Sequence, residues 1–117
     1  MTVISMPSRS DFDAVFDKPD AKSGTRDFLV LAKLTSEISC HRIGFVTPRK
    51  KIRRAVDRNR FRRVVREFIR SQYVAPDSDI VVIARKLPDG LRSRHFKDEL
   101  NQVFTKLTKQ LSAINAE

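Results

Sequence analysis

Residues 49–70 form a densely basic stretch whose apolar residues recur at helical spacing. The stretch contains eleven lysines and arginines and only two carboxylates, Asp57 and Glu67, so it carries nearly all of the chain's net charge of +10. At about 100° per residue, five apolar residues of its second half share one side of a helix. They are Phe61, Val64, Val65, Phe68 and Ile69. The stretch therefore predicts an amphipathic helix that packs one side on a core and turns arginines outwards.

The predicted helix does not extend back through the whole basic stretch. Ile52, Ala55 and Val56 would fall on its arginine side, so we place its start near Ala55 or Val56. Residues 50–54 are then a loop or a strand end, and Asp57 lies in the first turn, where a carboxylate suits the helix dipole. The residues expected opposite the apolar side are Arg58, Arg62, Arg63, Arg66 and Arg70, with Asn59 among them.

Three apolar runs predict strands around this helix. Residues 28–34 and 42–46 precede it and are close enough in sequence to pair as an antiparallel hairpin. Residues 80–84 follow it with the sequence Ile-Val-Val-Ile-Ala, which is typical of a central strand. Residues 22–25 give a weaker strand signal. The order strand, helix, strand predicts a crossover unit.

Two further helices are predicted, one near each end of the chain. Ser8 or Ser10 suits the cap of a short helix in which Phe12 and Phe16 share a face. Spacing alone favours core positions for both phenylalanines, with a partly exposed aromatic platform as the alternative. Residues 96–111 repeat apolar residues every three or four positions, which is typical of a core-packing helix.

Length and composition indicate a single soluble domain. The chain has 117 residues, and no apolar run approaches the roughly 20 residues of a membrane span. The N-terminus lacks the pattern of a signal peptide. Cys40 is the only cysteine, which excludes an internal disulfide. These features predict a cytoplasmic protein.

The sequence shows no convincing catalytic or metal-binding constellation. His41 and His95 have no nucleophile at a recognisable spacing. Asp11, Asp13 and Asp17 match no metal-binding loop. We therefore predict no catalytic residue and no metal site on this chain.

The basic stretch instead predicts a nucleic-acid interface. Arginine binds phosphate in a bidentate fashion, and like charges at this density repel one another unless a polyanion neutralises them. An arginine helix can dock in a DNA major groove or lie along folded RNA, and the pattern alone favours neither. A basic helix on a membrane surface would carry a similar charge.

Within residues 49–67, the string RKKIRRAVDRNRFRRVVRE resembles the signature of the bacterial ribonuclease P protein component. In that family a lysine-rich loop leads into Ala-Val-x-Arg-Asn-Arg-x-x-Arg-x-x-Arg-Glu. The matching residues are Ala55, Val56, Arg58, Asn59, Arg60, Arg63, Arg66 and Glu67. The early aromatic pair and residues 28–31, 42–44 and 83–86 are also similar to the family in order and spacing.

The resemblance implies a single two-layer α/β (α+β) domain. Its elements would follow the order α-β-β-β-α-β-α, with a mixed sheet and a left-handed crossover around the arginine-rich helix. We assign the domain to residues 10–112, between a loose N-terminal segment at residues 1–9 and a tail at residues 113–117.

The resemblance also implies a function, that of an RNA-binding subunit of the ribonuclease P endonuclease, which removes the 5′ leader from precursor tRNA. The ribonuclease P RNA would supply the active site and bind the Mg²⁺ ions, and no membrane partner is implied. The residues that would contact this RNA are Arg49, Lys50, Lys51, Arg53, Arg54, Arg58, Asn59, Arg60, Arg62, Arg63 and Arg66. Those that would line a cleft for the leader are Phe12, Phe16, Phe28, Arg85 and Lys86.

One position departs from the family pattern, because Leu31 stands where some members carry an aromatic residue. Base stacking at that position is therefore not expected. The alternative function is that of a basic ribosomal protein that stabilises ribosomal RNA. A DNA-binding regulator is the third possibility.

Overall fold

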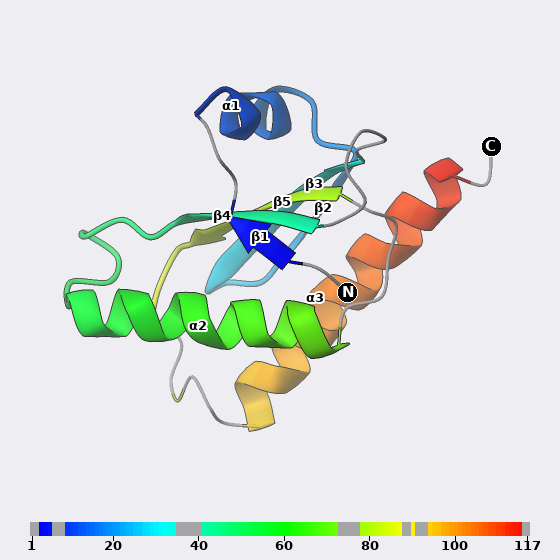
Figure 1. Ribbon diagram of the computed structural model, residues 1–117. Coiled ribbons are helices and arrows are strands. Elements are labelled where there is room, and N and C mark those ends of the chain that lie inside the picture. The colour runs from blue at the N-terminus through cyan, green and yellow to red at the C-terminus, as the bar shows by residue number, and fades with distance from the viewer. Residues whose placement is uncertain are drawn as a thin grey trace.

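The computed structural model describes residues 3–5, 9–34, 41–72, 78–87, 90 and 94–115 of the chain. Within these residues, one five-stranded sheet lies between a short helix and two longer helices (Figure 1). The strands are β1 (Val3–Ser5), β2 (Ala21–Gly24), β3 (Phe28–Leu34), β4 (His41–Val46) and β5 (Ser78–Ala84). The helices are α1 (Arg9–Asp17), α2 (Ala55–Gln72) and α3 (Arg94–Asn115). The predicted α+β class is confirmed, as is the predicted order of elements from α1 onwards.

The sheet is mixed, with the strand order β1-β4-β5-β3-β2. β4 is parallel to both β1 and β5, whereas β3 is antiparallel to both β5 and β2. The predicted hairpin between β3 and β4 is wrong, because β5 lies between them. A strand that is apolar on both faces is best buried in the middle of a sheet, and β5 is buried at nearly every position.

β1 lies inside the N-terminal segment that we expected to be loose. Val3–Ser5 pairs in parallel with residues 41–43 of β4. The β-branched residues Val3 and Ile4 favour an extended backbone, but a run of three residues is too short to show a strand period. The expectation of a loose segment is therefore wrong for these three residues.

The larger core lies between the sheet and the layer formed by α2 and α3. Val30 and Val82 point into it from β3 and β5, and Phe61, Val65 and Ile69 point into it from α2; all five are fully buried. Burial of each such side chain stabilises the fold by about 1.5–3 kcal/mol. α3 adds Phe96, Leu100, Val103, Phe104, Leu107 and Leu111. Both predicted apolar helix stripes are thus confirmed.

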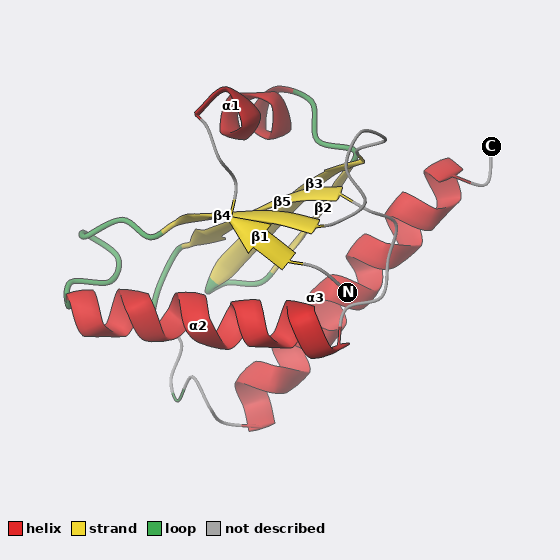
Figure 2. Cartoon of the chain, viewed as in Figure 1, coloured by secondary structure: helices red, strands yellow, loops and turns green. Residues whose placement is uncertain are grey.

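α1 lies over the opposite face of the sheet from α2 and α3 (Figure 2). A smaller cluster of buried residues lies beneath it. Val15 of α1 packs there on Leu31 and Val81, and Phe12 lies beside them. The predicted two layers describe the larger core, and α1 adds a short third layer on the opposite face. The sheet consequently presents two differently covered faces.

α2 begins at Ala55, as the helical period predicted, and a tight loop precedes it. The amides of Lys51 and Ile52 both donate to the carbonyl of Pro48, at 3.0 Å. This turn folds Ile52 back into the larger core, where it is 1% exposed. β4, α2 and β5 form the predicted crossover unit, whose left-handedness stays a prediction. Among the described helices, none has the length and apolar character that a membrane span requires.

Candidate nucleic-acid interface

The outer side of α2 carries a shallow hollow of about 560 Å³, which we call the arginine surface. It is lined by Asn59, Arg62, Arg63, Arg66, Glu67 and Arg70. Arg63 and Arg70, together with nearby Arg60, are exposed and have no carboxylate at ion-pairing distance among the described residues. Arginines without counter-ions at this density offer sites for several phosphates. Arg70 was not among the predicted contact residues, yet it lines the same hollow.

Two arginines of this surface are held in place by the protein itself. Arg62 donates from Nη1 to Oδ1 of Asn59 at 3.0 Å and from Nη2 to Oγ1 of Thr47 at 2.7 Å. The Arg66 guanidinium carbon lies 5.6 Å from the centre of the Phe45 ring, within cation–π range. Because both side chains are already ordered, binding a phosphate costs them less conformational entropy.

Arg58 holds the loop of residues 49–54, which we call the basic loop, against the start of α2. Its Nη1 donates to the carbonyls of Ile52 at 3.0 Å and Arg53 at 2.9 Å. Arg58, like Arg62 and Arg66, is half-buried. At 100° per residue, Arg58 and Arg62 both fall at the Ile69 edge of the apolar side, so the prediction that they lie opposite that side is wrong.

The other predicted contact residues lie in the loop before α2. Arg49, Lys50, Lys51, Arg53 and Arg54 are all exposed. Arg54 approaches Asp57 only at 4.0 Å, and a surface ion pair of this kind adds little stability. The structure thus places the predicted RNA-contact residues on α2 and the loop that leads into it.

On the opposite face of the sheet, Phe12 and Phe16 have different environments. Phe12 is half-buried and packs on Gly44 of β4, where an added Cβ would overlap the Phe12 ring. Phe16 is 43% exposed. Of the two alternatives that the sequence left open, the core position therefore describes Phe12, and the partly exposed aromatic ring describes Phe16.

Phe28 does not belong to the α1 face, so its predicted place in the leader cleft is wrong. It is fully buried in the larger core, edge-on to Phe96 with the ring centres 5.8 Å apart. Strand alternation instead puts Leu29 on the α1 face. There, Leu29, Val46 and Ile83 are half-buried beside the smaller cluster, and we call these three residues the apolar strip. The apolar strip was not predictable from the sequence, because both faces of β3 are apolar.

Arg85 and Lys86 leave the end of β5 shortly after Ile83, and both are exposed. Their amides donate to the carbonyl of Asp27, at 2.8 and 3.1 Å. Nη1 of Arg85 also lies 3.4 Å from the carbonyl oxygen of Thr25. The two cations therefore lie beside the turn between β2 and β3, at the end of β5.

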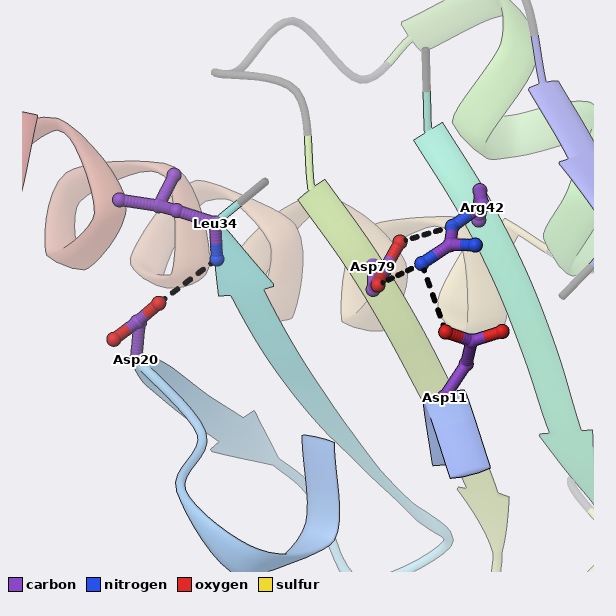
Figure 3. A network of polar contacts seen from close by, with 5 residues as sticks. All are labelled: Asp11, Asp20, Leu34, Arg42 and Asp79. Atoms are coloured by element: carbon purple, nitrogen blue, oxygen red, sulfur yellow. Dashed lines mark hydrogen bonds and ion pairs between the residues drawn. The ribbon is translucent and has the colours of Figure 1, made fainter. Parts of the chain in front are cut away.

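An ionic network fastens α1 to the sheet (Figure 3). Arg42 donates to both carboxylate oxygens of Asp79, from Nε and Nη2 at 2.6 Å each, and from Nη2 to Oδ1 of Asp11 at 3.2 Å. Arg42 and Asp79 are direct partners across β4 and β5, whereas Asp11 lies in the first turn of α1. The hydrogen bond with Asp79 raises the pKa of Arg42 above its ordinary value, although burial of the guanidinium acts in the opposite direction. The network gives α1 a defined position over the sheet.

The described residues contain no group of three His, Cys, Asp or Glu side chains that could hold a metal ion. His95 lies on the surface of α3, with Nε2 2.8 Å from Oε1 of Glu99, and its side chain is 80% exposed. The side chain of His41 lies outside the described part of the chain.

The fold and the site together define a class of protein. It is a small α+β domain whose basic helix and loop suit a polyanion. A family model described as Ribonuclease P matches residues 4–108, so the chain belongs to the ribonuclease P protein component family. Membership gives it a role in ribonuclease P, an endoribonuclease of tRNA processing, and displaces the ribosomal and DNA-binding alternatives.

Relatives and solved structures agree with this assignment. The ribonuclease P protein component of Aliivibrio fischeri is 37% identical over 100 residues, covering 85% of this chain and 84% of the relative. That of Chromohalobacter salexigens is 37% identical over 102 residues, covering 86% and 79%. A Staphylococcus aureus RNase P protein structure superposes with a TM-score of 0.70 at 26% identity, covering 89% of this chain and 96% of that one. The Thermotoga maritima RNase P protein gives 0.60 at 29% identity, covering 92% and 94%.

Proposed function

We propose that this chain binds the ribonuclease P RNA through α2 and the basic loop, and thereby assists removal of the 5′ leader from precursor tRNA. The observation that carries the proposal is the arginine surface. It combines guanidiniums that the protein has already ordered, at Arg62 and Arg66, with exposed ones that have no carboxylate partner among the described residues. Phosphates of a folded RNA supply the missing counter-charge, and family membership favours RNA over DNA.

The α1 face is the proposed site for the single-stranded leader. Phe16 of α1 exposes an aromatic ring there, and the apolar strip lies next to the smaller cluster on the same face of the sheet. Stacking of one base on an aromatic ring contributes about 1–3 kcal/mol. Arg85 and Lys86, exposed at the end of β5, add positive charge for the leader's phosphates.

The chemistry itself is assigned to the RNA, with Mg²⁺ bound mainly by RNA and none held by the protein. The protein contributes electrostatics. Two RNA molecules repel each other, and a cationic protein between them lowers the concentration of Mg²⁺ that their association requires. Since α1 and α2 lie on opposite faces of the sheet, one protein can contact the catalytic RNA and the leader together (Figure 1).

Cleavage of precursor tRNA at low Mg²⁺ tests the proposal. The assay uses the ribonuclease P RNA of the same bacterium, with and without this chain, and we expect the chain to stimulate cleavage. Failure to stimulate would overturn the proposed function. Cleavage by the protein without the RNA would contradict the assignment of the chemistry to RNA.

The double variant Arg62→Glu with Arg66→Glu tests the surface itself. We expect weaker binding of the ribonuclease P RNA, and a slope of log affinity against log salt that is smaller by roughly two, one for each lost phosphate contact. Lys106→Glu with Lys109→Glu is the charge-matched control, since both lysines are exposed on α3 and neither lines the arginine surface. Equal effects of the two double variants would count against a specific arginine surface.

A further inference from the structure

A groove of about 440 Å³ lies between α2 and α3. We propose that this groove holds one unpaired nucleobase of the RNA that α2 binds. The inference rests on the proposed function, because the base belongs to RNA held by the arginine surface. It adds a site that reads a base, beside a surface that only neutralises phosphates.

The groove adjoins the arginine surface, since Glu67 lines both. Arg63 and Arg70 lie four residues before and three residues after Glu67, on the same side of α2. An RNA backbone that contacts these two arginines therefore passes the mouth of the groove. A nucleotide of that backbone needs only to turn its base inwards to enter.

The α2 side of the groove offers apolar surface for a base. Val64 and Phe68 line it and are half-buried, so part of each side chain is open to the groove. The Phe68 ring packs on Phe104, with the ring centres 5.5 Å apart, which holds it in place. Bases stack on such rings whatever their sequence. The volume lies in the range that small ligands occupy, roughly 300–1,000 Å³.

Glu67 makes a base a better occupant than a phosphate. Its carboxylate is exposed, and among the described residues no cation lies at ion-pairing distance from it, although arginines surround it in sequence. A carboxylate repels phosphate but accepts hydrogen bonds from amino groups on base edges. Lys97 and Asn101 face it from α3 and can bind the nucleotide's phosphate and base edge. This chemistry favours guanine, adenine or cytosine over uracil, which has no amino group.

The direction in which Glu67→Gln changes RNA affinity distinguishes a base site from a surface that only neutralises phosphates. If Glu67 only repels phosphate, removal of its charge strengthens RNA binding. If it accepts hydrogen bonds from a base, we expect affinity to fall, by up to about tenfold for a bidentate pair. Binding to the ribonuclease P RNA is measured at fixed salt, and Glu67→Ala is expected to behave in the same way. An increase in affinity with either variant would overturn the proposal.

Substitutions on α3 provide a second test of the base site. Lys97→Ala and Asn101→Ala are expected to weaken RNA binding and to expose one unpaired base to reagents that modify its Watson–Crick edge. The control is Lys106→Ala. Lys106 is exposed on the same helix but lies about 180° around it from Lys97, at 100° per residue. If Lys97→Ala and Asn101→Ala match this control in both assays, the groove is not a base site.

The two proposals can fail separately. If Arg62→Glu with Arg66→Glu leaves RNA binding unchanged, the proposed function itself fails. If that double variant weakens binding while the groove variants do not, only the groove proposal is overturned.

Discussion

At the scale of single residues, three arginines with the same chemistry have three different roles. Arg42 is paired with Asp79 and Asp11 and joins a helix to the sheet. Arg62 is half-buried and ordered by neutral partners, so its charge remains available to a ligand. Arg63 is exposed on the arginine surface. Local environment, and not residue type, therefore separates structural arginines from those whose charge is available to a ligand.

Gly44 is predicted to be essential as a glycine because Phe12 covers it. A Cβ at this position would overlap the Phe12 ring, so Gly44→Ala must displace either the ring or β4. We expect the free energy of unfolding to fall by about 1–3 kcal/mol, as for other overpacked sites, measured by urea denaturation.

The Phe12→Ala background supplies the control for this prediction. Without the ring, Gly44→Ala loses the clash and is expected to cost much less, which a double-mutant cycle measures. The same cost in both backgrounds would show that the backbone, and not Phe12, sets the requirement for glycine.

At the scale of elements, α1 and α2 show two ways of attaching a helix. α2 has 18 residues and a long buried stripe, so packing alone explains its position. α1 has nine residues and only one fully buried side chain, Val15. A helix this short is marginal by itself. The ionic network around Arg42 therefore contributes more to holding α1 on the sheet than ion pairs contribute to holding α2.

Asp11→Asn is predicted to loosen α1 while leaving the pair between Arg42 and Asp79 in place. The substitution removes the carboxylate's charge, so the 3.2 Å bond from Arg42 becomes a weaker bond to a neutral amide oxygen while the side chain keeps its shape. A loss of about 1 kcal/mol would speed hydrogen exchange in α1 about fivefold. Asp13→Asn is the control, because Asp13 is exposed on the same helix. Equal protection of α1 in both variants would mean that apolar packing alone holds the helix.

At the scale of the whole molecule, the sheet separates two surfaces. α2 lies over one face of the sheet and α1 over the other (Figure 2). The groove lies beside α2, whereas the apolar strip lies on the α1 face. The charge follows this division, since residues 49–70 carry nearly all of the net +10. Because the sheet lies between the two surfaces, we expect a ligand on one surface to leave the other unchanged.

Additivity tests this separation. In the holoenzyme, Phe16→Ala is predicted to weaken binding of leader-containing precursor about tenfold, with little effect on mature tRNA. Arg62→Glu with Arg66→Glu is predicted to weaken binding of the RNA subunit. Because the changes lie on opposite faces, their effects on the free energy of precursor binding to the holoenzyme should add within about 0.5 kcal/mol when all three substitutions are combined. Equal effects of Phe16→Ala on precursor and mature tRNA would return Phe16 to a packing role.

Local pattern explains which parts of the fold were predictable. The start of α2 at Ala55, its apolar stripe and the central position of β5 all follow from the residues of each segment alone. β3 and β4 are neighbours in sequence, which predicted that they pair with each other. In the structure β5 lies between them and pairs with both. β5 comes some 30 residues after β4, and its nearly complete burial favours this central position. β1 was not predicted, because its three residues are too few to show the two-residue alternation of a strand.

Helical period, β-propensity and charge are properties of neighbouring residues, so the three helices, strands β2 to β5 and the charge block could be predicted from the sequence alone. The face that each strand side chain occupies depends instead on how the whole chain folds. The tertiary structure put Phe28 in the larger core and Leu29 on the α1 face, a choice that alternation leaves open when both sides of a strand are apolar. It also separated Arg58 and Arg62 from the exposed arginines, because their partners, the loop carbonyls and Thr47, come within reach only when the chain folds.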